Sequence, residues 1–162
     1  MFKKLGCLAL FVLINLGFIL TVHEGKTQNP RFTVSGDCVN DNLTGLMWAK
    51  NGNLPNGPRN WQGALDYVAS INSSSGLCGY KDWRLPNMNE LESLINASED
   101  DRATWLNTQG FSNVQSEYYW SSSEYAANTD LYAWAVPMWK FWTANIRKLQ
   151  KSCYVLPVRS GK

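Results

Sequence analysis

The chain has 162 residues, of which 44% are apolar and 17% charged, and its formal net charge is +2. This length suits one domain, and the composition supports a packed core and excludes an intrinsically disordered chain. The 8 Trp, 7 Tyr and 6 Phe are many for this size, so aromatic side chains are expected on a binding surface as well as in the core.

The N-terminus has the pattern of an export signal. Lys3 and Lys4 precede an apolar run over residues 5–22, which is typical of a secretory leader. We favour a cleaved signal peptide over residues 1–24, although the run is near the length that spans a bilayer and a retained anchor is the alternative. Residues 25–30 are then a linker, and residues 31–162 form one domain that is secreted or exposed on a bacterial cell surface. A membrane contact is expected only through an uncleaved N-terminal segment.

Three cysteines remain beyond the leader, namely Cys38, Cys78 and Cys153. One disulfide is expected in an oxidising compartment. Cys38 and Cys78 each lie beside a turn-rich segment, so we predict the bridge between them, which leaves Cys153 over. No CxxC or similar metal-binding spacing occurs, so no metal site is predicted.

Residues 79–95, GYKDWRLPNMNELESLI, contain a complete helix start. Pro86 ends the preceding extended segment. Asn87 can cap the next turn, and Glu90 can bond back to it in a capping box. An earlier helix is predicted after Asn60, where apolar residues recur at helical spacing.

The remaining segments are mostly extended. The order of strand, two helices and then several β segments predicts an α+β fold with the helices segregated from the sheet. Turn chemistry predicts loops at residues 37–45 and 99–101. The expected strands are residues 31–34, 46–48, 132–138, 141–151 (as strand, turn, strand) and 154–159.

Several side chains in these elements have structural roles in this interpretation. Asp82 and Arg84 flank Trp83 and are expected to pair with each other. Five tryptophans are expected in the core, namely Trp48, Trp61, Trp83, Trp120 and Trp134.

The chain contains few residues or motifs that are suited to catalysis. The single histidine, His23, lies at the edge of the leader, so the domain has no imidazole for general base, nucleophile or metal chemistry. No glycine-rich phosphate loop or groove-reading motif is present. We therefore predict no enzyme, no catalytic residue, no cofactor and no nucleic-acid partner.

Charge is distributed unevenly. Residues 131–162 hold six basic side chains and no acidic one, whereas residues 26–130 hold seven basic and twelve acidic. Trp139 and Trp142 lie among Lys140, Arg147 and Lys148, and we expect them to form an exposed patch. Such a patch suits an anionic glycan or an acidic protein surface.

Several ordered motifs together resemble one known family. They are TGLMWAKN at residues 44–51, the helix from Trp61, residues 79–95, GFSNVQSEYYWSSSEYA at 110–126, AW at 133–134 and the closing PVRSG. This set is similar to the C-terminal domain of the Legionella collagen-like adhesin family. The resemblance implies a C-type-lectin-like fold, with two helices flanking a small, mostly antiparallel sheet and paired terminal strands. It also implies extracellular binding, with sulfated polysaccharides among the ligand classes.

A second resemblance concerns residues 120–158. Domains of this kind occur as targets of diversity-generating retroelements, in which scattered codons are rewritten while a scaffold is kept. By this resemblance Trp134, Val136 and Met138 match scaffold positions. The positions that look variable, and so would form the ligand surface, are Ala135, Pro137, Trp139, Lys140, Trp142, Asn145, Arg147, Lys148, Gln150, Lys151 and Cys153.

Three functions follow in order of preference. The first is an exported, non-enzymatic binding domain with a diversified surface and an unidentified protein or glycan ligand. The second is a fixed adhesin for sulfated or other anionic polysaccharides. The third is an enzyme of the formylglycine-generating type, which needs a reactive cysteine pair.

Overall fold

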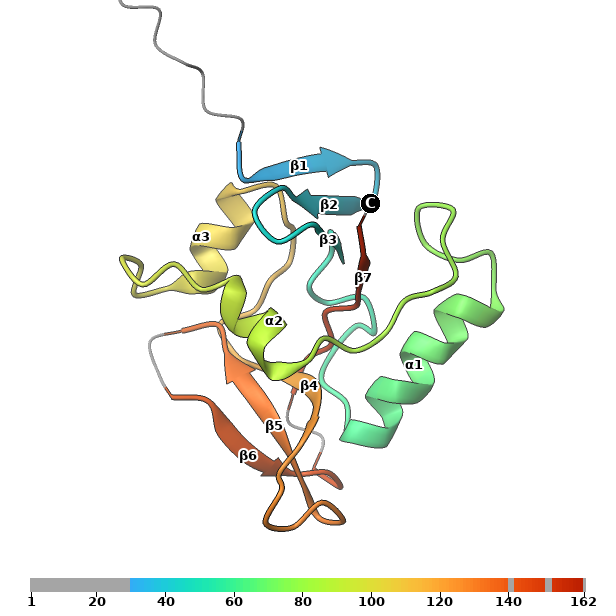
Figure 1. The fold of residues 1–162 in the computed structure, drawn as a ribbon, viewed down its shortest axis with the longest axis vertical. Coiled ribbons are helices and arrows are strands. Elements are labelled where there is room, and N and C mark those ends of the chain that lie inside the picture. Colours follow the sequence, from blue (N-terminus) through green and yellow to red (C-terminus); the bar gives the residue numbers. More distant parts are fainter. Residues whose placement is uncertain (1–29, 140–141, 151–152, 162) are drawn as a thin grey trace, which may run out of the picture.

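The computed structural model describes residues 30–139, 142–150 and 153–161. The leader, Lys140 and Lys151 thus lie outside the described residues. In chain order the elements are β1 (Phe32–Ser35), β2 (Cys38–Asp41), β3 (Leu46–Ala49), α1 (Trp61–Ser73), α2 (Met88–Ser93), α3 (Arg102–Thr108), β4 (Tyr118–Glu124), β5 (Tyr132–Pro137), β6 (Ala144–Arg147) and β7 (Val158–Ser160) (Figure 1).

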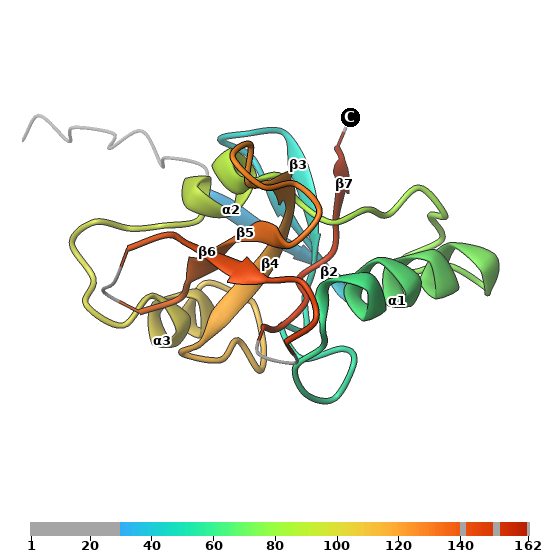
Figure 2. The ribbon, with the colours of Figure 1, turned by 90° about the horizontal axis from the view of Figure 1, so that it is seen from below.

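The strands form two antiparallel sheets, with the orders β1-β2-β3-β7 and β4-β5-β6. Helix α1 lies on one side of the molecule and α3 on the other, with strands between them in both views (Figures 1 and 2). The predicted α+β class is therefore confirmed.

The expectation that the two terminal strands pair with each other is wrong. Strand β7 pairs with β3, and β2 and β3 separate it from β1. The cause is β2, which lies in a segment predicted as a loop. Gly36, at φ +60°, turns the chain directly after β1, and Val39 of β2 is buried opposite Trp48.

A C-terminal segment, residues 153–160, connects the two sheets. The Tyr154 N–H donates to the Tyr118 carbonyl at 2.7 Å, and Tyr154 in turn accepts from the Trp120 N–H at 3.0 Å, which joins the segment to β4. Further along, Val158 pairs with Trp48 of β3 and exchanges two hydrogen bonds with Arg84. Strands from distant parts of the chain are held in one frame by this segment.

The helix starts follow local sequence. Asn60 caps α1 by accepting from the Gly63 N–H at 2.8 Å. Asn87 and Glu90 form the predicted capping box of α2. Helix α3, which was not predicted, begins directly after the predicted acidic loop of residues 99–101, because Asp101 accepts from the Thr104 N–H and so acts as a cap.

The predicted pairing of Asp82 with Arg84 is wrong. Arg84 binds Glu90 through two bonds of 2.7 Å, because the cap of α2 already fixes Glu90. Asp82 instead accepts from Arg159, a residue of β7, at 2.7 Å. Each charged group therefore links two different segments rather than two neighbours in one segment.

The core contains most of the predicted residues. Cys38 and Cys78 form the expected disulfide, with an S–S length of 2.05 Å. Trp48, Trp83 and Trp120 are buried. The tryptophans of α1 and β5, Trp61 and Trp134, are only half-buried, so the prediction of core positions is wrong for these two.

Asp41 is a buried charge in this frame. Its carboxylate accepts bonds from Arg31 at 3.1 and 2.9 Å and from the Leu43 N–H at 3.0 Å. Burial opposes ionisation and by itself would raise the pKa of Asp41, but these bonds outweigh it and hold the pKa below its usual value of 3.8.

We predict that Asp41→Asn lowers the free energy of unfolding at neutral pH by about 1–3 kcal/mol, since Arg31 loses its charged partner. A carboxyl whose pKa is depressed on folding stabilises above its unfolded pKa and loses this effect as pH falls through the folded value. The difference between the two proteins should therefore shrink between about pH 5 and pH 2. Urea denaturation across pH measures this, and a pH-independent difference would contradict it.

A candidate ligand-binding surface around β6

Strand β6 is an edge strand of the three-stranded sheet. It pairs only with β5 among the described strands, with Arg147 opposite Tyr132 and Ala144 opposite Ala135. In Figure 1 it forms the lower left border of the molecule. The segment that the sequence singles out as variable is thus largely at a surface.

The predicted site residues separate into four groups. Trp142, Asn145, Arg147 and Gln150 are exposed, with Trp142 at 86%. Trp139 and Lys148 are half-buried. Lys140 and Lys151 lie outside the described residues. The buried members are Ala135, Pro137 and Cys153.

These buried members do not belong to an exposed surface, which corrects their assignment. At the end of β5, Ala135, Val136 and Pro137 are buried in succession, so both faces of the strand are covered there. Ala135 and Cys153 are fully buried and share one apolar cluster with Trp120 and Val155. Strict alternation between scaffold and surface therefore fails along β5.

The expected patch of tryptophans and cations is also divided. Trp142 precedes β6, whereas Arg147 ends it, so the strand separates them by roughly 15 Å at about 3.3 Å per residue. Trp139 packs edge-on against Tyr118, with ring centroids 4.7 Å apart. One cation of this segment, Lys148, contacts a different tryptophan at the other end of β6.

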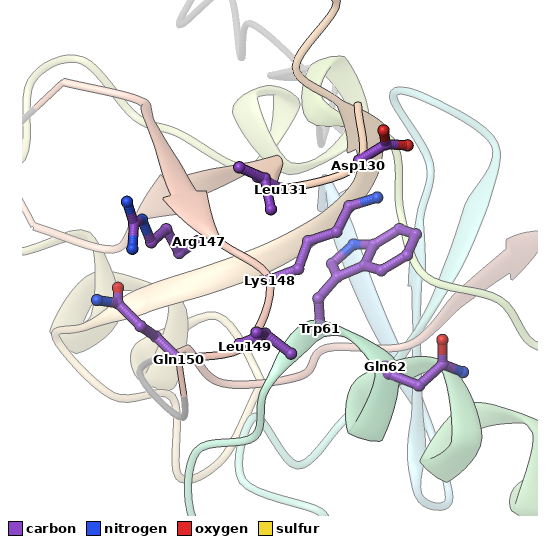
Figure 3. A pocket seen from close by; sticks show the side chains of 8 residues that line it. All are labelled: Trp61, Gln62, Asp130, Leu131, Arg147, Lys148, Leu149 and Gln150. Carbon is purple, nitrogen blue, oxygen red and sulfur yellow. The ribbon is translucent and has the colours of Figure 1, made fainter. Parts of the chain in front are cut away.

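That tryptophan is Trp61, at the start of α1. The Lys148 ammonium lies 4.0 Å from the centroid of the Trp61 ring and also binds Glu124 at 2.7 Å and the Thr129 carbonyl at 2.6 Å. Figure 3 shows the Lys148 side chain running alongside the indole, while Arg147 points away from it. Lys148 is thus committed to contacts within the protein.

A cleft of about 560 Å³ opens beside this contact. Leu131 and Leu149, exposed at 48% and 84%, place apolar side chains on it. The full lining is Trp61, Gln62, Asp130, Leu131, Arg147, Lys148, Leu149 and Gln150 (Figure 3). Sequence reasoning missed Trp61, Leu131 and Leu149 as surface residues, because an apolar residue is expected in the core and only the fold shows otherwise.

Arg147 faces a row of aromatic rings on the sheet. Its Nε donates to the Tyr132 hydroxyl at 3.2 Å, and its guanidinium lies 5.9 Å from the centre of that ring. Tyr125 contacts both Tyr132 and Trp134 edge-on. The exposed cation is therefore oriented by an aromatic support.

Main-chain hydrogen bonds attach the chain between Met138 and Cys153 to the rest of the structure. The Trp61 N–H donates to the Lys148 carbonyl, and the Arg59 N–H donates to the Cys153 carbonyl, each at 2.9 Å. The Ala103 N–H donates to the Met138 carbonyl at 2.9 Å before the segment begins. None of these bonds involves a side chain of the segment.

Two absences bear on the site. In residues 30–139, 142–150 and 153–161, no group of three or more His, Cys, Asp and Glu side chains is placed to hold a metal ion. Across that same part of the chain, every helix is too short or too polar to cross a bilayer.

The fold and this surface define a small α+β domain of two sheets with an exposed edge strand. Residues 37–159 match the Lcl C-terminal domain, and the chain belongs to this family, which indicates an adhesin-like domain. A comparison with curated proteins gives no match. The matched region extends from the turn before β2 into β7, so it includes the whole candidate surface.

Substitution of the neighbouring cations Lys148 and Arg147 tests whether Lys148 alone stabilises the fold through its contacts with Glu124 and Trp61. Lys148→Gln removes the ion pair with Glu124 and the contact with Trp61, so it should lower the free energy of unfolding by about 1–2 kcal/mol. Arg147→Gln is the matched control, and its effect should stay within about 0.5 kcal/mol because the side chain is exposed. Urea denaturation measures both, and equal losses would contradict the assignment.

Proposed function

We propose that the protein is an exported, non-enzymatic binding domain whose ligand surface is the outward side of residues 142–150, and that this surface is diversified by a retroelement. The observation that carries the proposal is the way in which the segment is held. Main-chain atoms attach it at Lys148 and Cys153 and along β6, while its outward side chains are exposed.

This arrangement separates structure from recognition. A main-chain hydrogen bond forms whatever side chain its residue carries, except that proline has no N–H to donate. Replacement of the exposed side chains therefore leaves the attachment of the segment unchanged. Those side chains are Trp142, Asn145, Arg147, Leu149 and Gln150.

Export is supported by two features. The basic and apolar N-terminal pattern is typical of a leader. The Cys38–Cys78 disulfide joins segments that are 40 residues apart, and such bridges persist in oxidising compartments. Both features suit an adhesin-like domain outside the cytoplasm.

The cysteines also support a non-enzymatic function. An enzyme of the formylglycine-generating type needs two reactive thiols. Cys38 and Cys78 are bridged, and Cys153 is fully buried. The described residues therefore offer no accessible thiol pair for that chemistry.

The charges favour a diversified surface over a fixed polyanion site. Lys148 is paired with Glu124, and Arg159 with Asp82. Among the described cations of residues 131–161, only Arg147 lacks a carboxylate partner within the part of the chain that the structure describes. Two of the three described cations in this part of the chain, Lys148 and Arg159, are thus neutralised by carboxylates.

The genomic DNA that flanks the gene tests whether the proposed ligand surface is diversified. We predict a near-copy of the DNA that encodes residues 120–162, next to a reverse transcriptase gene and differing at adenines of the copy. The differences should change exposed positions such as Trp142 and Arg147 and should spare buried ones such as Ala135, because only the former tolerate exchange. A flanking region without such a copy would overturn the diversification.

A glycan array tests the fixed adhesin. Because most described cations are paired, we predict no binding to sulfated chains that is both strong and sensitive to salt. Strong binding that is lost at high ionic strength, and lost again in an Arg147→Gln variant, would instead support the fixed polysaccharide adhesin.

A further inference from the structure

The hydrogen-bonding direction along β6 is fixed by its pairing with β5. The Lys148 N–H donates to the Leu131 carbonyl at 2.9 Å, so this pair is of the hydrogen-bonded kind. Bonded and non-bonded pairs alternate in an antiparallel ladder. Ala144 and Ile146 therefore direct their main-chain groups toward β5, and Asn145 and Arg147 direct theirs to the free edge.

This edge offers three main-chain groups. They are the N–H and C=O of Asn145 and the N–H of Arg147, none of which has a hydrogen-bond partner among the described residues. The Arg147 carbonyl already accepts from the Gln150 N–H at 3.0 Å. The three groups are spaced as a strand presents them, which a neighbouring polypeptide strand can match.

Apolar side chains are concentrated at the two ends of this edge. Among the large apolar side chains that are exposed in the described residues, Trp142 and Leu149 lie just beyond the two ends of β6, whereas Leu131 lies opposite Lys148 on the side of β5. An exposed edge is normally protected by charges, and Arg147 alone would serve that purpose. The apolar ends act against such protection, which indicates a surface that a partner covers.

We propose that β6 binds an extended peptide segment of a partner protein by strand addition, with an acidic residue opposite Arg147 and an apolar residue at each end. This inference rests on the proposed function and names the ligand class of the same surface. The main-chain groups favour a polypeptide, because a glycan lacks the regular alternation of donors and acceptors.

A second copy of the chain is a poorer occupant than an acidic peptide. Pairing of two β6 edges would leave Arg147 without a carboxylate opposite it, because residues 142–150 contain no acidic side chain, and Arg147 opposite Arg147 would be destabilising. An acidic residue opposite Arg147 gains a cross-strand ion pair instead. The positive charge of Arg147 thus favours an acidic peptide over a second copy of the chain.

The probe is the octapeptide Leu-Thr-Glu-Val-Thr-Val-Thr-Val, which runs antiparallel to β6. Its Glu lies opposite Arg147, its central Thr opposite Asn145, and its apolar ends meet Leu149 and Trp142. We expect amide shifts and slowed hydrogen exchange at Asn145 and Arg147 in NMR spectra of the 15N-labelled protein. A probe with Lys in place of Glu should bind about tenfold more weakly.

Methylated probes separate strand addition from other contacts. N-methylation of the central Thr amide, which would donate to the Asn145 carbonyl, should abolish binding. N-methylation of the two Val amides on either side of the central Thr, which face solvent, should leave it unchanged. Equal binding of the two methylated probes, or no binding of the unmethylated one, would overturn the proposal while leaving the test by genomic sequence unaffected.

Protein variants give the complementary test. Asn145→Pro removes one edge donor, and proline is tolerated where an edge strand faces solvent, so peptide binding should be lost. Asn145→Ala changes the same side chain but keeps the N–H, so binding should persist. Binding that depends on the side chain and not on the N–H would also overturn the proposal, and thermal melting checks that both variants are folded.

Discussion

The connection of two sheets by one C-terminal segment is the constraint on which the rest of the structure depends. Tyr154 is hydrogen-bonded to β4, and Val158 is hydrogen-bonded to Arg84 and paired with β3. The segment is buried from Val155 to Val158, so moving it would expose apolar surface at about 25 cal/mol per Å². Neither sheet can shift relative to the other while these bonds persist.

This constraint explains how an irregular segment can have a defined position. The described residues of this segment lie between Met138, which follows β5, and Cys153, and both of these residues are buried. The path between them includes a strand that is bonded to its neighbour by main-chain groups. The frame thus determines where the segment lies, while its outward side chains determine what it contacts.

Local signals in the sequence predicted local features well. The caps at Asn60 and Asn87 depend on a few adjacent residues, and both helices begin as expected. Features that depend on distant segments were missed or misassigned. The partner of Asp82 is Arg159, 77 residues away, and nothing near Asp82 indicates it. The burial of Ala135 likewise depends on strands and loops from other parts of the chain.

The burial of Cys153 has a consequence for how the protein is made. A third sulfur in a chain with one disulfide can attack that bridge and produce mispaired isomers. In the native protein the thiol is fully enclosed, so exchange is blocked once folding is complete. Before that point, Cys38, Cys78 and Cys153 can all take part in exchange. Docking of residues 153–160, which encloses the Cys153 thiol, is therefore the step that ends such exchange.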